Sequence, residues 1–306
     1  MQGSRTTKNP STPMKQLFLI SFIFLCFDLL ARQIEETTFS YWDKPDAQIY
    51  FSKPDSIDAN TKIIFIMHGA SRTAEQYLID WLPLANNRNV VLIAPEFSKE
   101  YYPEYVYLMM STERGRMLKD ESLYLTDSLG TLFDYFKAKL KLSTTTYRLY
   151  GHSGGSQFVH RYLLLSDERR VEKAAMANAG LYTFVDDQIP YPFGIKNMNV
   201  SDERLAWFLR LKGGVFLGAA DNDPRHHLLL SSRKARKQGK HRFERGNNFF
   251  NDLIKLGVEN NLPFRWRFQT VPSIAHDNAG MSLAASEFLL EDLYAVFFSI
   301  NSSAAL

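Results

Sequence analysis

The feature that most constrains the fold is the stretch over residues 147–160, YRLYGHSGGSQFVH. A short apolar run meets a GxSxG motif centred on Ser153 and passes directly into a helical pattern, which is typical of a sharp strand-turn-helix, or nucleophile elbow. The residues two before and two after such a serine must be small, and here they are Gly151 and Gly155. This geometry lifts the Ser153 hydroxyl clear of a sheet and leaves the Gly154 amide at a helix N-terminus, where it can donate to a developing oxyanion. The alternative interpretation is an ordinary glycine-rich turn.

Strand and helix patterns alternate on both sides of this motif. The sequence predicts strands or a hairpin within residues 33–51, buried strands at residues 62–67, 89–94, 147–150, 171–177, 214–217 and 264–271, and helices at residues 73–85, 121–142, 157–165, 202–211, 247–259 and 281–298. Repeated strand, helix and strand units imply a parallel sheet. We therefore predict an α/β fold, with a mostly parallel central sheet and helices on both faces, as a single domain over residues 34–306.

The N-terminal residues 1–31 have the pattern of a targeting segment. Basic residues precede an apolar run over residues 17–27 that is too short to span a bilayer comfortably. We interpret it as a secretory signal cleaved after Ala31, which predicts a secreted or periplasmic product, and an uncleaved membrane anchor is the alternative. Met14 also begins a typical signal by itself, so an over-called start before it stays open. The single cysteine, Cys26, lies in this segment, so a cleaved product contains no disulfide.

A general base and an acid are needed to activate a serine nucleophile, and in this arrangement they follow it in the order acid, then histidine. His276 is the histidine that follows a late predicted strand, so we expect it to be the base. Asp221 follows the strand at residues 214–217 and is the expected acid, whereas Asp223 is expected to be a turn carboxylate. Weaker candidates for the acid are Asp186, Asp187 and Asp277.

The loop after the first buried strand is expected to supply a second oxyanion donor. It begins with His68-Gly-Ala, and the residue after His-Gly makes the amide of Ala70 the candidate donor beside that of Gly154. For His68 itself, a ring packed under the loop is at least as good an interpretation as a catalytic part. This chemistry requires no metal and no organic cofactor.

These motifs resemble those of bacterial α/β-hydrolases related to polyhydroxybutyrate depolymerases and similar secreted serine esterases. The similarity covers nearly all of residues 41–298, and its distinctive pieces are HGASR at 68–72, GHSGGSQFVHR at 151–161, NAG at 178–180 and QGKHRFERG at 238–246. The resemblance implies an α/β-hydrolase fold with Ser153, Asp221 and His276 as a catalytic triad. It transfers the reaction class better than the substrate. One departure is the pair of alanines in LGAAD at residues 217–221, where relatives often carry a larger or acidic residue.

The sequence therefore predicts a serine hydrolase that cleaves carboxylic esters, small or polymeric, through an acyl-enzyme. A peptidase or amidase with the same triad stays open, and so does an inactive binding protein of the cell envelope. Aromatic residues within 101–107 and 181–193 either bind a polymer or pack in the core and a lid.

Charge is local in this chain, because the net charge of +3 is small for 306 residues. Basic residues are concentrated between positions 225 and 245. They form either a solvated surface or a rim of the site that favours an anionic substrate or weak contact with a membrane surface. Nucleic acid is not an expected partner, since no aromatic residues are interleaved with these charges before Phe243.

Overall fold

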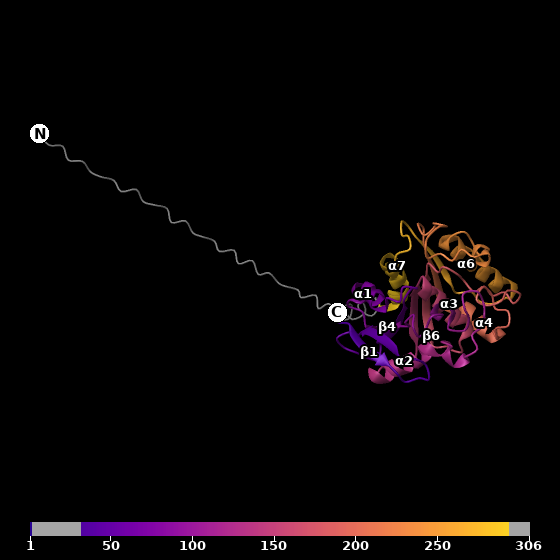
Figure 1. Ribbon diagram of the computed structural model, residues 1–306. Helices are drawn as coiled ribbons and strands as arrows, with labels where there is room; N and C mark the ends of the chain where they lie inside the picture. Colours follow the sequence, from indigo (N-terminus) through magenta and orange to yellow (C-terminus); the bar gives the residue numbers. More distant parts are fainter. Residues whose placement is uncertain (2–31, 294–306) are drawn as a thin grey trace. The chain divides into compact units, whose positions relative to one another are not determined.

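A computed structural model describes Met1 and residues 32–293 of the chain (Figure 1). Residues 2–31 of the predicted targeting segment lie outside the described residues, and so does the end of the last predicted helix, residues 294–298. None of the helices within residues 32–293 combines the length and apolar character needed to cross a membrane.

Eight strands form one sheet in the order β1-β2-β4-β3-β5-β6-β7-β8. The first two strands pair antiparallel with each other, β2 also pairs antiparallel with β4, and the remaining neighbours are parallel. The strand bounds are β1 Glu35–Phe39, β2 Ala47–Ser52, β3 Lys62–Met67, β4 Val90–Glu96, β5 Tyr147–His152, β6 Val171–Ala177, β7 Lys212–Gly218 and β8 Arg267–Val271. This confirms the predicted mostly parallel sheet and the N-terminal hairpin.

Helices cover both faces of this sheet, as predicted. Figure 1 shows α1 and α7 together on one side of it and α3, α4 and α6 on the other. The helix bounds are α1 Ala74–Ala85, α2 Ser128–Lys139, α3 Gly154–Leu165, α4 Asp202–Arg210, α5 Arg233–Arg236, α6 Arg242–Glu259 and α7 Asn278–Leu290, with short 3-10 turns η1 Tyr105–Tyr107, η2 Glu121–Leu123 and η3 Glu291–Leu293.

Alternation along the buried strands explains why two cores form. In β3, Phe65 and Met67 pack into the core that includes α2, α3, α4 and α6, whereas Ile64 and Ile66 pack against α1 and α7. Successive side chains of a strand point to opposite faces, so a continuous apolar run suits a sheet that is covered on both sides.

The predicted long helix over residues 121–142 is wrong in its first third. The Asp120 carboxylate accepts a hydrogen bond from the Ser122 amide at 3.1 Å, which starts the separate turn η2. The Leu125 amide then donates to the Leu108 carbonyl at 2.9 Å, a loop contact that takes the place of a helical bond. Side-chain and loop partners of this kind compete with helix formation, so α2 begins only at Ser128.

The helix predicted at residues 247–259 begins earlier, at Arg242. Its N-cap is His241, whose Nδ1 accepts a hydrogen bond from the Glu244 amide at 3.2 Å. Histidine is not among the usual N-cap residues, which is why the sequence did not reveal this start.

Candidate active site

Ser153 lies at the turn between β5 and α3 with φ 56° and ψ −115°, a left-handed region that costs a non-glycine residue roughly 1–3 kcal/mol. Its amide donates to the Ala177 carbonyl of the neighbouring strand at 2.9 Å. A Cβ at Gly151 would lie 2.4 Å from the Gly155 carbonyl, and a Cβ at Gly155 would lie 1.9 Å from the Met67 oxygen. The turn between β5 and α3 is therefore sharp, and it leaves no room for a side chain at Gly151 or Gly155.

The structure brings together the three side chains that the sequence nominated. His276 Nε2 lies 2.9 Å from Ser153 Oγ, and His276 Nδ1 lies 2.7 Å from Asp221 Oδ2. Asp221 follows β7 and His276 follows β8, so both reach Ser153 from the carboxyl edge of the sheet. Their side chains are only 3% and 9% exposed, whereas Ser153 is partly open to solvent.

The other carboxylates that were considered for the acid have local roles. Asp223 is exposed and accepts a hydrogen bond from the Arg225 amide at 2.8 Å, as expected of a turn residue. Asp277 caps α7 by accepting from the Gly280 amide at 2.7 Å. Asp186 accepts from the Gln188 amide, and Asp187 accepts from the side chain of the same glutamine.

The second oxygen of Asp221 is held by a buried arginine. Arg242 Nη1 donates to Asp221 Oδ1 at 3.1 Å, and both side chains are at most 3% exposed. Burial alone would raise the pKa of Asp221, but the hydrogen bond and charge of His276, together with those of Arg242, outweigh it and hold that pKa below its usual value. Asp221 is therefore ionised at neutral pH.

The Ala70 loop lies directly against the turn that holds Ser153. A Cβ at Gly154 would stand 2.9 Å from the Ala70 amide nitrogen, so the two candidate oxyanion amides are neighbours. Beneath them, His68 is fully buried: its Nδ1 donates to the Gly69 carbonyl at 2.9 Å and its Nε2 accepts from the Phe97 amide at 3.0 Å. Burial lowers the pKa of His68 to about 3, which makes it a neutral ring packed under the loop.

Two further imidazoles flank His276. The His152 ring is centred 4.7 Å away, and its Nδ1 lies 3.0 Å from the Tyr77 hydroxyl. The His226 ring is 5.3 Å from that of His276, and its Nδ1 accepts from the Leu228 amide at 3.2 Å. Burial, with the charges of nearby groups, lowers the pKa of both His152 and His226. His276 thus lies between two uncharged imidazole rings.

Sequence reasoning placed Arg242 in a basic stretch and missed its contact with Asp221. In that stretch Arg242 and Arg245 are buried, whereas five other basic residues are exposed: Arg233, Lys234, Arg236, Lys237 and Lys240. A signal was present in the spacing, because both arginines continue the helical stripe formed by Phe249 and Leu253 on the buried face of α6. Charged residues on an apolar stripe are almost always paired or hydrogen-bonded.

Most of the aromatic residues in the two segments considered for polymer binding are buried. Tyr102, Tyr105 and Tyr107 pack in the core before Ser153, as do Tyr182 and Tyr191 after it. Their burial supports core packing for these residues, whereas Tyr101 is 51% exposed.

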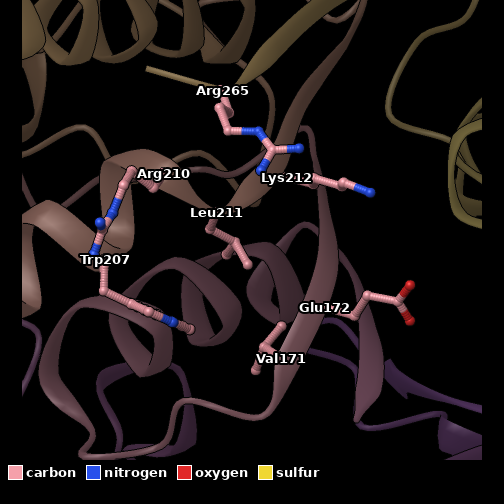
Figure 2. A pocket seen from close by; sticks show the side chains of 7 residues that line it. All are labelled: Val171, Glu172, Trp207, Arg210, Leu211, Lys212 and Arg265. Atoms are coloured by element: carbon pink, nitrogen blue, oxygen red, sulfur yellow. The ribbon is translucent and has the colours of Figure 1, made fainter. Parts of the chain in front are cut away.

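A hollow of about 330 Å³ lies at the opposite edge of the sheet, beside the first residues of β6 and β7. Figure 2 shows Arg210, Lys212 and Arg265 around it, with Leu211 and Val171 below. Its lining contains no serine, cysteine or histidine, unlike the carboxyl edge, where Ser153 and His276 lie. Within the described residues, no group of three histidine, cysteine, aspartate or glutamate side chains is placed to hold a metal ion.

No protein-family model matches the chain, and no curated protein matches it. Among solved structures, poly(aspartic acid) hydrolase-1 from Sphingomonas sp. KT-1 is 33% identical over 84% of this chain and 98% of its own, with a TM-score of 0.78. LpqC, a poly(3-hydroxybutyrate) depolymerase from Bordetella parapertussis, is 23% identical over 86% of this chain and 92% of its own, also with a TM-score of 0.78. FphF, a fluorophosphonate-binding serine hydrolase from Staphylococcus aureus, shares the fold at 16% identity over 84% of this chain and 96% of its own, with a TM-score of 0.53.

These neighbours are hydrolases, and the first of them is similar enough in sequence over most of both chains to establish kinship. The chain is accordingly a hydrolase, and it belongs to the same family as poly(aspartic acid) hydrolase-1, the α/β-hydrolases of the polyhydroxybutyrate depolymerase type.

Proposed function

We propose that this protein is a serine hydrolase that cleaves carboxylic esters through an acyl-enzyme. The observation that carries the proposal is the unbroken hydrogen-bonded series from Ser153 through His276 to Asp221. An arrangement of nucleophile, base and orienting carboxylate at hydrogen-bond distance is the geometric signature of this chemistry. The strained turn at Ser153 is further support, because backbone strain in proteins is concentrated at functional sites.

In the proposed mechanism, Ser153 Oγ attacks the ester carbonyl while His276 Nε2 accepts the hydroxyl proton. The amides of Ala70 and Gly154 donate to the oxyanion of the tetrahedral intermediate. Asp221 holds His276 in the required tautomer and stabilises the imidazolium. His276 then gives its proton to the leaving alcohol, and a water molecule activated by the same ring releases the acid from Ser153.

Amide cleavage in a polyanion is a second candidate function. The relative at 33% identity is a poly(aspartic acid) hydrolase, and a triad of this kind also cleaves amides. Lys237 and Lys240 are exposed cations that follow Asp221 in the sequence. Their positive charge favours binding of an anionic polymer at the rim of the site. Esters and polyaspartate amides are thus the two substrate classes to compare.

The N-terminal pattern supports a further part of the proposal, that the enzyme is exported. A polymeric substrate cannot enter a cell, so a secreted or periplasmic location fits either candidate function. The intact mass of exported protein reports whether residues 1–31 have been removed.

The test compares hydrolysis of p-nitrophenyl esters from acetate to palmitate with depolymerisation of poly(aspartic acid), using the native chain and Ser153→Ala. We expect turnover of at least one class, with a loss of at least about 10³-fold in kcat for Ser153→Ala. A fluorophosphonate should label the native chain at Ser153 and leave the variant unlabelled. Turnover that survives Ser153→Ala, or labelling at another residue, would overturn the proposal.

A further inference from the structure

We propose that Asn178 is a positioning residue that holds the loops of His276 and Asp221 in register with Ser153. The inference rests on the proposed function, in which these three residues act together. Asn178 is fully buried immediately after β6, and its side-chain amide hydrogen-bonds to backbone groups of Gly218 and Ala275. It acts through the backbone of the loops that carry Asp221 and His276.

The strand order gives Asn178 a central place. Ser153 follows β5, Asp221 follows β7 and His276 follows β8, while β6 lies between β5 and β7. The carbonyl of Ala177, one residue before Asn178, accepts the Ser153 amide at 2.9 Å. The end of β6 is therefore already fastened to the nucleophile, and the Asn178 side chain extends from it in the direction of the other two loops.

Both ends of the Asn178 amide are used. Its Oδ1 accepts a hydrogen bond from the Gly218 amide at 2.8 Å, and its Nδ2 donates to the Ala275 carbonyl at 3.0 Å. Gly218 is the last residue of β7, three positions before Asp221, and Ala275 immediately precedes His276. One side chain thus joins the start of the acid loop to the residue next to the base.

These two partners specify asparagine. An amide nitrogen requires an acceptor opposite it and a carbonyl requires a donor, so the orientation of the Asn178 amide is fixed and aspartate cannot supply both bonds. The backbone of Asn178 has φ 48°, in the left-handed region that asparagine tolerates better than most residues. A shorter side chain would leave the Ala275 carbonyl without its partner in the part of the chain that the structure describes.

The acid and base loops are also joined directly, so Asn178 sets their placement relative to Ser153 more than their contact with each other. The amides of Ala219 and Ala220 donate to the carbonyls of Val271 and Ile274, each at 2.9 Å. Losing Asn178 would let this joined pair of loops move together away from the elbow. We therefore expect the distance from His276 Nε2 to Ser153 Oγ to lengthen before the contact between His276 and Asp221 changes.

The decisive variant is Asn178→Asp, which keeps the size and the acceptor for Gly218 but places a carboxylate oxygen opposite the Ala275 carbonyl. We expect kcat per fluorophosphonate-titrated site to fall roughly 10²-fold with KM nearly unchanged, because a displacement of about 1 Å has that effect on catalysis. The rate constant for fluorophosphonate labelling should fall in parallel. Asn178→Gly tolerates the left-handed backbone and lacks the hydrogen bonds to Gly218 and Ala275. It replaces the aspartate variant in these measurements if that variant does not fold.

The matched control is Asn261→Asp, since Asn261 is also left-handed, with φ 50°, but is exposed after α6. It should keep native kcat, labelling rate and melting temperature. A readout independent of turnover is the downfield proton resonance of His276 Nδ1–H bound to Asp221. This resonance should persist in both Asn178 variants, because Asn178 acts on the Ser153 side, and a purely structural role would instead lower the melting temperature alone.

The outcomes separate the two proposals. If the native chain is not labelled at Ser153, the proposed function fails. If Ser153 is labelled normally in both Asn178 variants and kcat per labelled site is native, the triad stands and the positioning role of Asn178 is wrong. Loss of the His276 resonance in these variants would also overturn it, because the lesion would then lie in the pairing of acid and base.

Discussion

The buried ion pair between Arg242 and Asp221 bears directly on the proposed chemistry of the site. Arg242 is 1% exposed, and Asp221 uses one carboxylate oxygen for this arginine and the other for His276. Burying a charge is costly unless it is paired, so removal of one partner leaves the other in an unfavourable state. Arg242 therefore stabilises the ionised acid on which the tautomer of His276 depends.

Replacing Arg242 by methionine is expected to destabilise the fold and to change the pH profile. Breaking a buried ion pair costs about 3–5 kcal/mol, and the value here should lie near the lower end because His276 still binds Asp221. Removing a cation favours proton uptake by the coupled Asp221–His276 pair, so the acid limb of kcat/KM should move to higher pH. Denaturant unfolding and a pH series of kcat/KM measure the two effects.

Arg245→Met is the control for this variant. Arg245 is equally buried on α6, but its hydrogen bonds go to the carbonyls of Gly239, Gly180 and Leu230. It should lose stability without a shift of the acid limb. An equal shift in both variants would show that general loosening of α6, not the Asp221 contact, controls the pH profile.

At the scale of elements, α3 packs closely on the sheet, and glycines permit it. A Cβ at Gly155 would meet the backbone of Met67 in β3, and a Cβ at Gly151 would meet the backbone of Gly155. Backbone atoms cannot swing aside as side chains do, so these two positions fix the distance from α3 to β3 and β5. The same distance sets the height of Ser153 above the sheet.

Gly155→Ala is therefore expected to force α3 away from β3, at a cost of about 3 kcal/mol or more, with loss of Ser153 labelling. Gly257→Ala in α6 is the matched helical control, because its Cβ would lie 3.4 Å from Phe264 Cβ, an ordinary contact. Alanine is the better helix former, so that variant should be neutral or up to about 1 kcal/mol more stable. Thermal unfolding of the Gly155→Ala and Gly257→Ala variants tests this prediction. Equal melting temperatures for the two variants would contradict the proposed role of Gly155.

At the scale of the whole molecule, local patterns predicted the sheet and the elbow because each depends on neighbouring residues. The run at residues 62–67 is apolar after Lys62, as expected of a strand that is covered on both faces. The two glycines of the elbow lie two residues before and two residues after Ser153 in the sequence. The order Ser153, Asp221, His276 follows from successive strand ends.

What the sequence did not reveal depends on residues far apart in the chain. Asn178 and Ala275 are 97 positions apart, and Leu108 replaces a helical partner of Leu125 only once the loops have folded together. For Arg242, the helical spacing indicates the buried face of α6 but does not identify Asp221, 21 positions away in the sequence, as its partner. Long-range hydrogen bonds of this kind leave little trace in periodicity or composition.

Two buried charges in the central strands hold α7 and the turn η3 that follows it to the sheet. Arg148 in β5 and Lys173 in β6 are at most 2% exposed, and both bind Asp292 in η3, at 2.5 and 3.0 Å. They also donate to the Leu289 and Phe288 carbonyls at the end of α7, where cations suit the helix dipole. The end of α7 is thereby fastened to the edge of the sheet opposite Ser153.

This arrangement predicts how stability depends on acid. Burial would raise the pKa of Asp292, but hydrogen bonds from Arg148 and Lys173 outweigh it and hold that pKa well below its usual value. A carboxyl group whose pKa is lowered by folding stabilises the protein above its unfolded pKa of about 4, and that contribution is lost as the pH falls further. Unfolding free energy should thus decline below about pH 4.

Asp292→Asn should lower the unfolding free energy at neutral pH by about 1 kcal/mol, a modest value because the Asp292 side chain is 43% exposed and solvent screens the pair. Since the variant has no charge to lose there, its curve should approach that of the native chain below about pH 4. Asp187→Asn, on an exposed turn, should follow the native curve throughout. Urea unfolding between about pH 2 and pH 7 measures all three curves. The prediction fails if the difference in unfolding free energy between Asp292→Asn and the native chain is the same at every pH in that range. The charge of Asp292 would then not be what holds the end of α7 to the sheet.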